Sequence, residues 1–301
     1  MRIVSLFPAA TEIVCALGLR DQLVGVSHRC DYPPEIEGLA VVTRPQTGES
    51  AVAARAAAAV GEEMGPAELD RPALLASQPD LVIVREGGLG PGAGAVREAL
   101  GEAATGPSII SLDPVSLEGI FHSITSIGAM TETEDEAIGL LEALREEIGE
   151  IEQQVVVRHD GGLAPKRVVV LEALEPLLAS GRWVPEQVRR AGGWDLLGRD
   201  GEPASPTSWE AVRDVDPEML ILAPAGLSLR DSKRAWAQTE KPEMWDEIGA
   251  VRRGQVFIAE PVYFCRPGPR VVDGVAMLAE IFDPEGFIET SPPASWTPIL
   301  E

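Results

Sequence analysis

The sequence contains few cysteines, few histidines and no long hydrophobic run. Its three cysteines, Cys15, Cys30 and Cys265, are an odd number without C-x-x-C spacing, which argues against a disulfide framework and against a zinc ribbon. No apolar run approaches the roughly 18 residues that a membrane helix needs, so membrane insertion is not expected. Only three histidines occur in 301 residues. They leave little capacity for acid–base chemistry, and we predict no catalytic residues.

Basic residues and export signals are also scarce. The chain has 25 Lys and Arg against 48 Asp and Glu, a formal net charge of -23, and a field of that sign repels nucleic acid. The N-terminus "MRIVSLFPAATEIV" has one Arg, no long apolar core and no small-residue cleavage site. As written, the chain is expected to be cytoplasmic; it would be periplasmic or on the cell surface if a leader has been omitted.

Alternating apolar runs dominate what is present. Hydrophobic residues make up 45% of the chain, enough to fill cores, and short runs alternate with longer amphipathic ones, which predicts an α/β fold with parallel sheets. The length predicts two lobes. Strands are expected at "RIVSLF", "QLVGVS", "PDLVIV", "PSIISLD", "RVVVLEA", "EMLILAP" and "QVFIAE". Helices are expected at 8–17, 49–64, "PEQVRRAG", "SWEAVRDV", 230–238 and "VVDGVAMLAEIF".

One long amphipathic segment separates the two halves. In "TETEDEAIGLLEALREEIGEIEQQVVVR", Thr133 and Glu136 have capping-box spacing and apolar residues follow at helical intervals for about seven turns. This pattern predicts a connecting strut between two Rossmann-like lobes. The expected division is an N-terminal lobe at 1–132, a backbone helix at 133–158, a C-terminal lobe at 159–290 and a loose proline-rich tail at 291–301.

In open α/β sheets, ligands bind beyond the carboxyl ends of the strands. His28 and Cys30 in "SHRCDYP" could contribute to a metal site, but three or four ligands are needed and none recurs nearby, so no metal is predicted. Phe7, beside a proline, could instead pack against the start of the helix. Arg44 could instead be a solvated loop residue. The candidate ligand-binding residues of the first half are Phe7, Pro8, His28, Tyr32, Arg44, Glu86 and Gly87.

The second half offers aromatic rings and a guanidinium. Trp183 in "SGRWVPEQV" precedes a helix start, where it could form a flat wall for a ligand or pack between the lobes. Tyr263, Phe264 and Arg266 in "YFCRPGPRVVDG" lie where the last strand ends. Arg266 is a candidate partner for ligand amides or a phosphate, whereas Arg270 is expected to brace the fold.

The segments "RIVSLFPAATEIVCALGL", "LVGVSHRCDYP", "PDLVIVREGG", "AGGWDLLG" and "YFCRPGPRVVDG" occur in this order. As an ordered set they resemble the cobalamin-binding branch of the substrate-binding proteins of ABC importers. That family also contains iron-siderophore and haem binders. The resemblance implies a class III substrate-binding protein that works as a monomer, holds a corrinoid such as vitamin B12 between two lobes with little hinge motion, and can deliver it to a permease.

The resemblance also bears on the walls of the site. Pro45 and Ser205 stand where periplasmic cobalamin binders carry tryptophans against the corrin. Trp183 and Tyr263 are then the available aromatic walls. The sequence therefore predicts a corrinoid-binding protein for uptake or intracellular handling, with an iron-siderophore or haem binder as the alternative. A thiol-dependent enzyme acting on a metal chelate through Cys30 and Cys265 is a weaker alternative.

Overall fold

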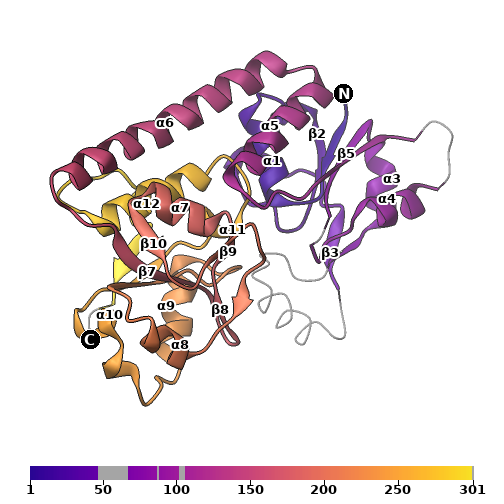
Figure 1. Cartoon of the computed structure of the whole chain (residues 1–301). Helices are drawn as coiled ribbons and strands as arrows, with labels where there is room; N and C mark the ends of the chain where they lie inside the picture. The colour runs from indigo at the N-terminus through magenta and orange to yellow at the C-terminus, as the bar shows by residue number, and fades with distance from the viewer. Residues whose placement is uncertain (47–66, 87, 102–105, 300–301) are drawn as a thin grey trace.

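Two lobes are joined by one long helix, as Figure 1 shows; the computed structural model describes residues 1–46, 67–86, 88–101 and 106–299. The first lobe contains a four-stranded parallel sheet in the order β2-β1-β5-β6. Its inner strands are runs of Val, Ile and Leu buried on both faces, as parallel sheets require. The predicted strands are confirmed as β1 (Ile3–Ser5), β2 (Leu23–Val26), β5 (Leu81–Arg85) and β6 (Ser108–Leu112).

Helices and a small ribbon complete the first lobe. Proline begins α1, as predicted, and Ser116 caps α5 by accepting from the Gly119 backbone N–H. The sequence did not predict α5, because its Ser, Thr and Gly residues have weak helix propensity. The predicted helix at 49–64 lies outside the described residues. The elements are α1 (Pro8–Ala16), β3 (Thr43–Pro45), β4 (Ala67–Leu69), α3 (Arg71–Ser77), α4 (Ala93–Leu100), α5 (Leu117–Thr131) and 3-10 turns at Arg20–Gln22 and Pro34–Ile36.

The second lobe contains a mixed sheet. Strands β10, β7, β13 and β14 pair in parallel, whereas β8, β12 and β15 are antiparallel to their neighbours. The predicted loose tail is corrected here, because part of it pairs with β14; proline is tolerated since this strand lies at a sheet edge. The strands of this sheet are β7 (Lys166–Leu174), β8 (Leu177–Ala179), β10 (Gly193–Asp195), β12 (Ser205–Pro206), β13 (Met219–Leu222), β14 (Val256–Ala259) and β15 (Trp296–Pro298), and β9 (Gly181–Arg182) pairs separately with β11 (Arg199–Asp200).

Short helices cover this second sheet. Trp209 packs with Trp236 and Trp245, whose ring centroids lie 6.3 and 5.6 Å away. No helix among the described residues is long and apolar enough to cross a membrane. The helices are α7 (Val184–Arg190), α8 (Trp209–Asp214), α9 (Leu229–Gln238), α10 (Gly249–Arg252), α11 (Val262–Cys265), α12 (Val271–Phe282) and a 3-10 turn at Trp245–Glu247.

The connecting helix is α6 (Glu134–Asp160), 27 residues long, and it runs along both lobes (Figure 1). It contacts α5 of the first lobe and α7 and α12 of the second. Thr133 is the N-cap, but its side chain makes no capping hydrogen bond, so the predicted capping box does not form. The buried side chains recur every three or four positions and so form one stripe. They are Ala137, Leu141, Leu144, Ile148, Ile151 and Val155.

Close contacts hold α6 at both ends. A Cβ atom added to Gly128 of α5 would lie 2.7 Å from the Ala137 Cβ, so only glycine allows α5 and α6 to approach this closely. At the other end, Arg158 donates to both carboxylate oxygens of Asp283, at 2.5 and 2.8 Å. Asp283 lies just beyond the end of α12. Each lobe is therefore fastened to the same rigid helix, which favours a fixed relation between them.

Candidate ligand-binding cleft

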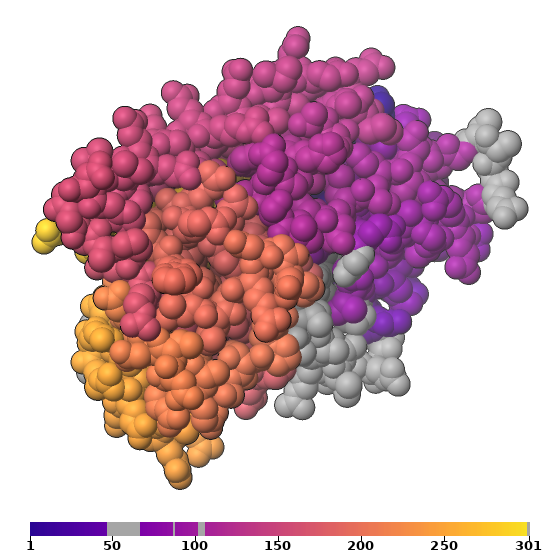
Figure 2. All heavy atoms as spheres, viewed as in Figure 1, coloured from indigo at the N-terminus to yellow at the C-terminus, as the bar shows by residue number. Residues whose placement is uncertain are grey.

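A cavity of about 420 Å³ lies where loops from the two lobes meet. In the space-filling view, the second lobe (orange) lies directly against the first (purple) beneath α6 (Figure 2). The cavity is formed by the segments after β2, β13 and β14, all at the carboxyl ends of parallel strands, where open α/β sheets bind ligands. The residues around it are His28, Arg29, Asp31, Tyr32, Gly226, Leu227, Ser228, Glu260, Val262, Cys265, Arg266 and Arg270.

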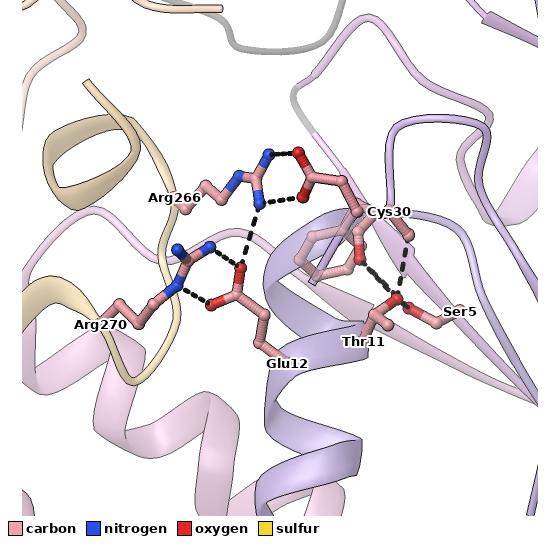
Figure 3. Close-up of polar contacts among 8 residues, drawn as sticks. Ser5, Thr11, Glu12, Cys30, Arg266 and Arg270 are labelled. Atoms are coloured by element: carbon pink, nitrogen blue, oxygen red, sulfur yellow. Dashed lines mark hydrogen bonds and ion pairs between the residues drawn. The ribbon is translucent and has the colours of Figure 1, made fainter. Parts of the chain in front are cut away.

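Two arginines and two carboxylates from different lobes form an ionic network at the wall of this cavity (Figure 3). Arg266 donates to both oxygens of Asp31, at 2.6 and 3.0 Å, and to Glu12 Oε1 at 3.2 Å. Arg270 donates through Nε to Glu12 Oε2 at 3.0 Å and through Nη2 to Glu12 Oε1. Glu12, on α1, thus binds two cations of the second lobe at once.

Burial makes this network electrostatically strong. The side chains of Glu12 and Arg266 are 2% and 7% exposed, so their attraction is screened far less than that of a surface pair. Burial by itself raises the pKa of Asp31, but the hydrogen bonds and charge of Arg266 outweigh it, and the net pKa of that carboxyl is lowered. The two arginines are therefore matched by two carboxylates, and the network is close to neutral.

Aromatic rings surround Arg270. Its guanidinium carbon lies 4.2 Å from the Tyr32 ring centroid and 5.8 Å from that of Tyr263. Both distances fall within cation–π range. Burial raises the pKa of the Tyr263 hydroxyl, which stays protonated near neutral pH. Tyr32, which lines the cavity, is 43% exposed.

Hydroxyl groups hold the residues of the loop after β2. Thr11 donates to Ser5 Oγ at 2.8 Å and lies 3.0 Å from the Cys30 sulfur (Figure 3). His28 Nδ1 lies 2.8 Å from Thr43 Oγ1, and burial followed by the charge of Arg29 lowers the pKa of this imidazole. Among the described residues, no three His, Cys, Asp or Glu side chains are grouped so as to hold a metal ion.

The structure brings some predicted site residues together and separates others. His28, Tyr32 and Arg266 line the cavity, and Tyr263 lies beside it against Arg270. Four other candidates belong to the main hydrophobic core or lie buried beside it, away from the cavity wall. They are Phe7, Pro8, Trp183 and Phe264, and the exposed fraction of the Trp183 side chain is 2%.

The remaining candidates lie elsewhere in the first lobe. Arg44 is exposed on β3 and pairs with Glu68 of β4 at 2.8 Å. Glu86 accepts from the Ala93 backbone N–H at the start of α4, at 2.9 Å, and from Ser111 at 3.2 Å. Gly87 lies outside the described residues. Arg44 and Glu86 thus have local partners and do not line the described cavity.

Sequence reasoning missed several residues of the cavity. Glu12 of the adjoining ionic network was assigned to a helix interior, Asp31 was read only as part of a polar loop, and Glu260 was placed at the end of the predicted strand "QVFIAE". Arg270 was predicted to brace the fold, which its bonds to Glu12 confirm, but it also lines the cavity. A carboxylate on the otherwise apolar α1 was the available signal, because a buried charge requires a partner.

Comparison with known proteins agrees with this fold. The periplasmic binding protein family model matches residues 3–263. An uncharacterized ABC transporter substrate-binding lipoprotein of Bacillus subtilis is 27% identical over 96% of this chain and 82% of its own length. The vitamin B12-binding protein of Vibrio cholerae is 25% identical over 92% of this chain and 87% of its own.

A solved structure shares the architecture. The periplasmic haem-binding protein of Pseudomonas aeruginosa is 25% identical to this chain and superposes with a TM-score of 0.68 over 94% of this chain and 93% of that one. Its fold has the same class III arrangement of two lobes and a helical strut that the sequence predicted. The match of the family model over most of the chain shows that this protein belongs to the periplasmic binding protein family.

Proposed function

We propose that this protein binds one corrinoid, such as cobalamin, in the cavity between its lobes, as a monomer that delivers its ligand to an ABC importer. The vitamin B12-binding relative supports this ligand class over most of the chain. The matched relatives are named as binding proteins and not as enzymes. The lipoprotein relative does not support the expected cytoplasmic location, and we place the protein on the uptake side of the importer.

The observation that carries the corrinoid proposal is the neutral ionic network. Arg266 and Arg270 are already matched by Asp31 and Glu12, so these two cations do not call for an anionic ligand. A corrin bears amide side chains around its rim, whereas haem bears two carboxylates. Neutral amides suit hydrogen-bonding groups such as His28 at the cavity. The net charge of -23 further disfavours an acidic ligand.

Haem is the second candidate. The similar Pseudomonas structure is that of a haem-binding protein, and a flat tetrapyrrole could stack on the exposed ring of Tyr32 as a corrin could. The two ligands differ in charge and in absorption spectrum. Direct competition between cobalamin and haem for the same protein therefore separates the two proposals.

Tyr32→Ala should weaken cobalamin binding about tenfold to hundredfold, because it removes the exposed ring at the cavity, and truncation of an aromatic anchor costs about 1–3 kcal/mol. Isothermal titration calorimetry with cobalamin measures the change. The matched control is Trp194→Ala, which removes a side chain that is 69% exposed and lies outside this cavity. Equal affinities for the parent and Tyr32→Ala would place the ligand elsewhere.

A further inference from the structure

A second cavity, of about 400 Å³, lies beside the first. Among the described lining residues, the two cavities share Tyr32 and Arg270. The other residues that line the second cavity come from α1, the turns that follow it and the loop before α12; they are Glu12, Cys15, Ala16, Arg20, Pro33, Glu35 and Pro269. The two spaces therefore adjoin each other at one aromatic ring and one guanidinium.

Tyr32 and Arg270 form the boundary that the two cavities share. Arg270 is fixed by its bonds to Glu12 and lies 4.2 Å from the Tyr32 ring centroid. Tyr32 is 43% exposed. A ligand that crosses the edge of this ring would contact both cavities without breaking the pairing of Glu12 with Arg270.

The first cavity alone is small for a complete cobalamin. Pockets of about 300–1,000 Å³ hold drug-sized ligands, and at about 420 Å³ the first cavity is near the lower end of that range. A complete cobalamin is much larger than a drug-sized molecule, because a nucleotide loop with a phosphodiester and an aromatic base extends from the corrin ring. The second cavity provides adjoining room for that appendage.

The chemistry of the second cavity fits such an appendage. Cys15, Ala16 and Pro269 give it apolar surface suited to an aromatic base. Arg20 donates to the Glu35 carbonyl oxygen at 2.7 Å, a neutral partner, and the Asp21 carboxylate reaches it only at 4.0 Å. The carboxylates of Glu12 and Glu35 also line this cavity, but Glu12 is bound by Arg266 and Arg270, and no carboxylate of the described residues lies closer than 4.0 Å to the Arg20 guanidinium. Arg20 can therefore donate to a phosphodiester in a charge-assisted hydrogen bond.

We propose that the two cavities form one divided site, with the corrin ring in the first cavity and the nucleotide loop across Tyr32 in the second. This inference rests on the proposed corrinoid function. Ala16 is exposed and lines only the second cavity among the described residues. Ala16→Trp therefore fills that space without disturbing the core or the first cavity.

The test compares cobalamin with cobinamide, a corrinoid that lacks the nucleotide loop. Ala16→Trp should lower the affinity for cobalamin at least tenfold, whereas its affinity for cobinamide should stay within twofold of that of the parent. Arg20→Gln should weaken cobalamin about threefold to tenfold, again without affecting cobinamide. Ala237→Trp, at an exposed position of α9, is the matched control and should change neither affinity.

Two results would overturn the divided site. If Ala16→Trp binds cobalamin as tightly as the parent, the second cavity does not hold the nucleotide loop, although the corrinoid function stands. If Ala16→Trp weakens both corrinoids equally, the effect does not depend on the loop and the assignment is again wrong. A parent protein that binds neither corrinoid refutes the proposed function itself, and the divided site with it.

Discussion

Glu12→Gln should lower the free energy of unfolding by about 3–5 kcal/mol, because breaking a buried ion pair leaves uncompensated charge in the interior. The Glu12 side chain is 2% exposed and binds both Arg266 and Arg270. Glutamine keeps the size of the side chain but removes the charge that both guanidiniums share. Urea denaturation at neutral pH, read from the midpoint and slope, measures this loss.

The control for Glu12→Gln is Glu68→Gln. Glu68 pairs with Arg44 at 2.8 Å, but their side chains are 40% and 59% exposed, and exposed pairs contribute at most about 1 kcal/mol. If Glu12→Gln lowers the free energy of unfolding no more than Glu68→Gln does, the buried network does not stabilise the contact between the lobes. Ligand affinity should be compared only in variants that remain folded at the assay temperature.

Trp183→Ala should destabilise the fold by about 3–5 kcal/mol, the cost of removing a large aromatic side chain from a packed core. Trp183 is 2% exposed, and its indole nitrogen has no hydrogen-bond partner among the described residues. Trp183→Phe should therefore cost less than half as much, because it keeps most of the ring and removes an unsatisfied donor. Thermal and urea unfolding without ligand measure both variants.

This experiment also decides between the two roles that the sequence allowed for Trp183. A core residue loses stability on truncation, whereas a ligand wall loses affinity while the fold stays intact. Trp194→Ala, with a side chain that is 69% exposed, should change stability by no more than about 0.5 kcal/mol. A Trp183→Ala protein as stable as the parent but defective in cobalamin binding would restore the wall assignment.

The sequence predicted the architecture well because periodic patterns carry it. The apolar run at 166–174 and the apolar stripe on α6 can be read from the spacing of residues that lie close together in the chain. Helix α5 was missed because packing against α6, through Gly128, outweighs its weak propensity. The pairing of β15 with β14 was missed for a similar reason: edge pairing is decided by distant residues.

The site was harder to predict from sequence. His28, Tyr32 and Arg266 were found because the carboxyl-end rule locates loops. That rule does not say which side chain of a loop faces the cavity. Phe264 was therefore chosen as a site residue although it packs into the core, and Asp31, which lines the cavity, was not chosen. The pairing of Glu12 with residues more than 250 positions away, Arg266 and Arg270, depends on the packing of the lobes.

The most direct test of the corrinoid proposal is an absorption spectrum of the purified protein after incubation with equimolar cobalamin and haem, followed by gel filtration. Each chromophore reports its own capture, and the protein peak contains only ligand that is bound. We predict the cobalamin spectrum at one equivalent per chain, with little haem. A protein peak that carries haem, or neither chromophore, would contradict the assignment of this cleft to a corrinoid.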